Sequence, residues 1–202
     1  MAGRAFSDLY ARQQLTSVMR GPVRRCYEGT MSSVVAKNHE FGCACHGNTM
    51  VGQTDVTVSA CLERDHREID AILNDVESLV RRGEPSGAEQ LFGSFRGRLQ
   101  RHIEAEEEIL FPIYEQLSDN DGPTRVMLGE HAEIRRLMAT IAQGFQRPDT
   151  TRLLEAIRQL ARALSVHNMK EERVLYPGTD DALALDAERE ALVARLREHL
   201  AR

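Results

Sequence analysis

The chain has 202 residues, of which 42% are hydrophobic and 28% charged, and its formal net charge is −5. This length fits one domain of ordinary size with an appendage, and the composition argues against a globally disordered chain. The negative charge disfavours a dedicated nucleic-acid binder, which needs clustered Lys and Arg. No stretch has the ~18 apolar residues of a membrane span.

Residues 1–54 differ from the rest of the chain in charge and in pattern. They carry six Lys or Arg against three Asp or Glu and show no sustained hydrophobic period. We expect an irregular, partly helical appendage here, with Met31 and Met50 as alternative starts of the protein. No apolar block marks a signal peptide, and four cysteines without one indicate reduced thiols, so the protein is expected to be cytoplasmic.

Two cysteines of this appendage, Cys43 and Cys45, lie in the sequence FGCACHG. We interpret it as a glycine-rich loop with two ordinary thiols, because a c-type haem site needs C-x-x-C-H. Three histidines are predicted to be solvated: His39, His46 and His199.

From residue 55 onward the chain contains an internal repeat with a constant offset of 65 residues. The segment 65–69 (DHREI) resembles 130–134 (EHAEI), and 102–112 (HIEAEEEILFP) resembles 167–177 (HNMKEERVLYP). The two halves align without a gap, and the matches include four of the seven histidines. Two copies of one supersecondary unit are therefore predicted.

Each half of the repeat carries two apolar stripes with residues three or four positions apart, which is helical spacing. The stripes predict four amphipathic helices, near residues 56–82, 87–111, 124–144 and 150–175. In the first connection, Ser86 and Glu89 have the spacing of a capping box. Pro112 is expected to end or kink the second helix and Pro177 to end the fourth. Because the connections are short, the fold class is an all-α, up-down-up-down four-helix bundle.

Residues 183–200 predict a further helix with less regular apolar positions. This helix either caps the bundle or joins two chains in a homodimer. The predicted organisation is an irregular appendage at 1–54, a four-helix bundle at 55–178 and a C-terminal helix at 179–202.

Six polar side chains lie on the inward stripes of the predicted helices. They are His66, His102, Glu106, His131, His167 and Glu171. A single His on an apolar face is usually a core residue with one hydrogen bond. A Glu there is harder to explain, because burying an unpaired carboxylate costs several kcal/mol. A divalent cation would offset that cost, so these six residues are the predicted metal ligands.

A cluster of His–Glu ion pairs is the alternative without metal, but it does not explain why both halves contribute the same set. Two carboxylates can bridge two cations while four imidazoles supply terminal ligands, with positions left open for a small ligand. Nitrogen and oxygen donors without Cys favour iron or manganese over structural zinc. The Glu-x-x-His pattern of ferritin-like proteins occurs at Glu63 and His66, but leucines precede the other three histidines at that spacing.

The family that this pattern resembles is the hemerythrin-like (HHE cation-binding) domain, over about residues 58–178. The resemblance rests on the six polar residues, on the H-x-x-x-E spacing in each half, and on the LFP and LYP sequences that follow. It implies a four-helix bundle with a non-haem di-iron centre. By this resemblance, one iron is bound by His66 and His102 and the other by His131 and His167. The bridges between them are Glu106 and Glu171.

Two positions depart from the oxygen-carrying members of that family. Arg135 stands where they have a fifth histidine, and Glu171 follows His167 by four residues where they have an Asp at five. The pattern is similar to that of iron- or oxygen-sensing hemerythrin-like domains and of bacterial iron-centre repair proteins. Arg135 and the acidic run 104–108, apart from Glu106, are interpreted as solvent-exposed. Tyr176 either reaches the metal pocket or simply packs, and packing is the favoured alternative.

The predicted function is that of a non-haem protein with two irons, or with manganese, that binds or senses dioxygen, nitric oxide or peroxide. One alternative is an oxidoreductase or iron donor in nitrosative or oxidative stress, similar to iron–sulfur cluster repair proteins, and a need for Cys43 and Cys45 would favour the repair-like version. Another is a metal-free or zinc-stabilised interaction bundle. The spacing identifies no catalytic acid or base, so whether the protein is an enzyme stays open.

Overall fold

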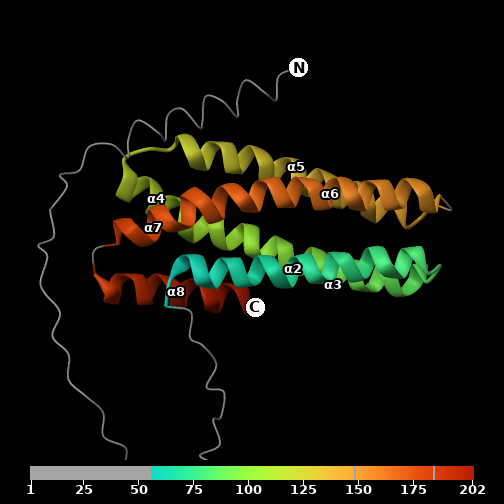
Figure 1. Cartoon of the computed structure of the whole chain (residues 1–202), viewed down its shortest axis with the longest axis horizontal. Helices are drawn as coiled ribbons and strands as arrows, with labels where there is room; N and C mark the ends of the chain where they lie inside the picture. Colours follow the sequence, from blue (N-terminus) through green and yellow to red (C-terminus); the bar gives the residue numbers. More distant parts are fainter. Residues whose placement is uncertain (1–55, 148, 184) are drawn as a thin grey trace, which may run out of the picture. The chain divides into compact units, whose positions relative to one another are not determined.

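The computed structural model describes residues 56–147, 149–183 and 185–202, and within these ranges every regular element is a helix. Four helical runs lie side by side along the bundle (Figure 1). In chain order they are α2 (Val58–Arg81); α3 (Pro85–Ala105) with η1 (Glu106–Leu110) and α4 (Phe111–Ser118); α5 (Gly122–Gly144); and α6 (Thr150–Lys170) with η2 (Glu171–Leu175) and α7 (Tyr176–Ala182). The prediction of an all-α four-helix bundle is confirmed.

The fourth run continues past Pro177, so the predicted end there is wrong, and the second run does not end at Pro112 either. Each proline follows a π-helical segment, η1 or η2. In η1 the backbone N–H at Phe111 donates to the carbonyl of Glu106, five residues earlier, and η2 makes the equivalent bond. The wider π turn lets the chain pass a residue that has no N–H and whose ring would clash with the preceding α turn.

The start of α2 is fixed by two side chains that accept its first backbone hydrogens. The Thr57 hydroxyl accepts from the N–H of Ala60 at 3.0 Å. The Asp180 carboxylate, which comes from α7, accepts from Val58 at 2.8 Å and from Ser59 at 3.0 Å. These groups have no partner within the helix, so the two caps satisfy them and tie the start of α2 to the fourth run.

The start of α3 differs from the predicted capping box. The turn before it contains Gly83 at φ +76°, and the helix begins at Pro85, so Ser86 already lies inside the first turn and caps nothing. Proline is favoured at the first helical position because its missing N–H would have no partner there in any case.

Two apolar clusters fill the bundle, and a layer of buried polar side chains lies between them. In α2, Leu62 belongs to the cluster beside α4 and α7, and Ile69 belongs to the cluster nearer the α2–α3 and α5–α6 turns. The buried His66 lies between these two residues in the helix. The other three runs have the same order along their length, so the polar layer crosses the whole bundle.

The C-terminal helix α8 (Asp186–Leu200) packs on α2 and α3 (Figure 1). Its apolar side chains belong to the cluster beside α4 and α7. Leu192, Val193 and Leu196 are buried in that cluster with Cys61. Capping is therefore what the fold shows, and a dimer through this helix stays a prediction. His199 is 8% exposed on the same helix, so the prediction that it is solvated is wrong.

No helix in the part of the chain described here combines the length and apolar character needed to cross a membrane.

Candidate metal centre

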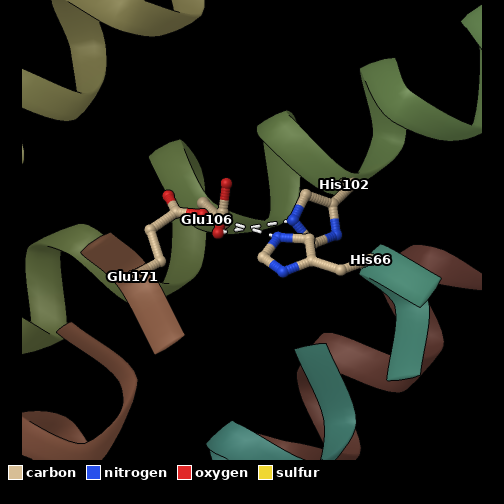
Figure 2. A group of neighbouring side chains, drawn as sticks. All are labelled: His66, His102, Glu106 and Glu171. Carbon is tan, nitrogen blue, oxygen red and sulfur yellow. Dashed lines mark ion pairs between the residues drawn. The ribbon is translucent and has the colours of Figure 1, made fainter. Parts of the chain in front are cut away.

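The six predicted side chains come together in the polar layer, and each is at most 3% exposed. Their donor atoms form two groups, and within each group the atoms all lie within 4.8 Å of one another. The first group is His66, His102, Glu106 and Glu171, shown in Figure 2. The second is His131, His167 and the same two carboxylates. The structure thus divides the histidines into the same pairs that the family resemblance implied.

Each of the two carboxylates presents one oxygen to each group. Glu106 has Oε1 3.4 Å from His102 Nε2 and Oε2 3.3 Å from His131 Nε2. Glu171 has Oε2 3.4 Å from His66 Nε2 and Oε1 3.3 Å from His167 Nε2. This arrangement suits a carboxylate that bridges two cations, and H-x-x-x-E spacing produces it by placing Glu one turn after His.

The other ring nitrogen of every histidine in the layer faces a second carboxylate. The Nδ1 distances are 2.9 Å for His102 to Asp65, 2.9 Å for His66 to Glu172, 2.9 Å for His131 to Glu107, and 3.1 Å for His167 to Glu130. Because an ionised carboxylate can only accept, Nδ1 carries a hydrogen, and in the neutral imidazole that binds a metal the lone pair is on Nε2, the nitrogen that faces the centre. Such outer carboxylates orient metal-binding histidines and raise their basicity.

Three of these outer carboxylates are held in turn by a cationic side chain. Arg98 donates to Asp65, and Lys170 donates to Glu130. Arg135 donates to both oxygens of Glu107, at 2.9 and 2.8 Å. The interpretation of Arg135 and Glu107 as a solvent face is therefore wrong, because the pair orients His131. Both sides of the pair remain partly exposed.

Tyr176 is fully buried, and its hydroxyl lies among the candidate ligands. It donates its single hydrogen to Glu106 Oε1 at 2.5 Å, and its oxygen lies 3.2 Å from Glu171 Oε2 and 3.1 Å from His66 Nε2. Burial and the negative charges of the two glutamates raise the pKa of this phenol well above its ordinary value. Of the two alternatives for Tyr176, the structure therefore favours the one in which it reaches the polar layer over simple packing.

The donor set fits a cation. Three of its buried atoms have no hydrogen-bond partner, namely His102 Nε2, Glu106 Oε2 and Glu171 Oε1, and a buried unsatisfied polar atom costs about 1–3 kcal/mol. Burial by itself would lower the pKa of His102, but Glu106 and Asp65 outweigh burial and raise it to about 10. The centre thus strongly favours positive charge, and a cation ligated by these atoms would supply it.

In this four-helix bundle, two histidine pairs share two buried carboxylates. This arrangement is typical of a helical metal-binding protein. Residues 57–179 match the hemerythrin HHE cation-binding domain, and the chain belongs to this family. Among curated proteins, a DNA nickase of Nostoc sp. (strain PCC 7120 / SAG 25.82 / UTEX 2576) is 25% identical over 122 residues. That match covers 60% of this chain and 33% of the relative, so the chain spans about a third of the relative's length. No solved structure gives a significant match to the chain.

Other sequence-based candidates lie outside the described residues. These are Cys43, Cys45, His39 and His46, with the rest of the 1–54 appendage.

Proposed function

We propose that the six side chains hold two iron ions in a non-haem centre, bridged by Glu106 and Glu171, that binds or senses a small ligand such as dioxygen, nitric oxide or peroxide. The observation that carries the proposal is the placement of one oxygen of each glutamate toward each histidine pair. The donor set of imidazole and carboxylate, without sulfur, favours iron and admits manganese.

With iron bound, such a centre would supply open coordination positions and a capacity to exchange two electrons. The chain's own residues provide the setting. The outer carboxylates fix the four imidazoles. Apolar clusters on both sides of the layer keep bulk water away from it.

Iron loading of the full chain tests the proposal. The protein is treated with ferrous iron without air and desalted, the bound metal is counted, and the absorption spectrum is recorded before and after exposure to air. We expect about two irons per chain, since the carboxylates join two four-residue groups. His102→Ala and His167→Ala should lose iron and melt at a lower temperature, because Glu106 and Glu171 would lose the charge that offsets their burial.

His199→Ala is the matched control, because His199 is also buried but lies outside the polar layer. Fewer than one iron per chain in the unaltered protein would overturn the proposal. So would an iron content that is unchanged in both ligand variants.

A further inference from the structure

The two metal groups differ at one pair of positions related by the internal repeat. Phe111 and Tyr176 are 65 residues apart, and each directly follows a π-helical segment. The Phe111 ring stacks on His131, with ring centroids 5.7 Å apart, and the Tyr176 ring lies at the same centroid distance from His66. The two rings therefore occupy equivalent places. Only the ring beside His66, that of Tyr176, carries a hydroxyl.

Packing does not account for that hydroxyl, since Phe111 fills the equivalent place without one. A single hydrogen bond does not account for its position either. The phenol oxygen lies 2.5 to 3.2 Å from donor atoms of three candidate ligands: His66, Glu106 and Glu171. Two ligands about 2.1 Å from one cation and at right angles to each other are about 3 Å apart. Two of the three distances, 3.1 Å to His66 Nε2 and 3.2 Å to Glu171 Oε2, match the spacing of a further ligand of the same cation.

We propose that Tyr176 is a ligand, through its phenol oxygen, of the cation held by His66 and His102, so that the two cation positions are chemically different. The proposal rests on the di-iron function proposed above. Tyrosine is a known protein ligand of iron, as in catalase. Binding through this oxygen releases the hydroxyl proton to solvent, one per chain. The cation held by His131 and His167 faces Phe111 and has no such ligand in the described residues.

The test uses the full chain loaded with ferrous iron and then oxidised in air. A phenol oxygen bound to ferric iron gives a visible phenolate-to-iron charge-transfer band. We expect this band in the unaltered protein and in Tyr114→Phe, a matched control at a tyrosine outside the polar layer. We expect its complete loss in Tyr176→Phe, with the iron content retained at about two per chain because the six other ligands remain.

Resonance Raman spectra of the unaltered protein, excited in the band, make the test independent of how well the variant folds. Tyrosine ring modes should be enhanced and should shift when ring-deuterated tyrosine is incorporated. A protein that binds two irons but shows no such band or no isotope shift overturns the role of Tyr176 and leaves the di-iron proposal standing. A band that survives in Tyr176→Phe also overturns the role. A protein that binds no iron overturns both proposals.

Discussion

Each histidine of the polar layer is oriented by an outer carboxylate, and these carboxylates follow the internal repeat. Asp65 and Glu130 are equivalent positions, as are Glu107 and Glu172. The first pair binds histidines within its own helical hairpin, whereas the second pair reaches across to the other hairpin. Each outer carboxylate thus has a defined role in the polar layer, which is to orient one histidine.

Glu107→Gln should weaken metal binding by about 10- to 100-fold, because the neutral amide gives His131 a poorer partner and leaves Arg135 without its counter-charge. Affinity would be measured by competition with a coloured chelator. Glu108→Gln is the matched control, since Glu108 is the next residue in η1 and is exposed. Equal affinities in the two variants would contradict the role of Glu107.

The six inner residues could be predicted from the sequence, because acids on an apolar stripe need an explanation for their burial. The outer carboxylates that surround these residues were not predicted. Glu107 sits in a run of acidic residues that looks like a solvent face. Its equivalence to Glu172 in the repeat is the signal that could have identified it. For Tyr176 the sequence favoured packing over contact with the ligands, for another reason. It lies five residues after Glu171, which is off the stripe in an α-helix but on the same face in a π turn.

The π-helical segments are the elements that adapt the bundle to its centre. Each begins at one of the two buried glutamates, Glu106 or Glu171, and is followed by an aromatic residue and a proline. The apolar period revealed the four runs and the short connections their antiparallel order, but neither revealed these segments, because five residues are too few to change the period visibly. The fourth run was therefore predicted to end too early, at Pro177.

The carboxylate of Asp180 joins α7 to the start of α2, and its loss should destabilise the fold. Asp180→Ala removes the acceptor for two backbone hydrogens and for the Ser59 hydroxyl. We expect a loss of about 1–2 kcal/mol in the free energy of unfolding, measured by urea denaturation.

Asp181→Ala is the control for this experiment, because Asp181 is adjacent and exposed. It should change the free energy of unfolding by less than about 0.5 kcal/mol. Similar losses in both variants would show that the cap contributes nothing specific.

At the scale of the whole bundle, α8 completes the apolar cluster that lies beside α4 and α7. Leu196 is fully buried there, so Leu196→Ala should lower the free energy of unfolding by about 2–5 kcal/mol. Leu128→Ala, at an exposed leucine of α5, should have little effect. Chemical denaturation of both variants checks this, and a small effect at Leu196 would mean that α8 packs only loosely on the bundle.

Neither hairpin can complete a cation site by itself, because each group of donors includes a glutamate from the opposite hairpin. Bound metal would therefore fasten residues 58–118 to residues 122–182 as if they were two subunits. A chain cut by a protease in the loop between α4 and α5 should elute as one particle on gel filtration while metal is present. Addition of a strong chelator should lower the urea concentration at which the two fragments separate, since the shared apolar clusters then hold them together without the metal.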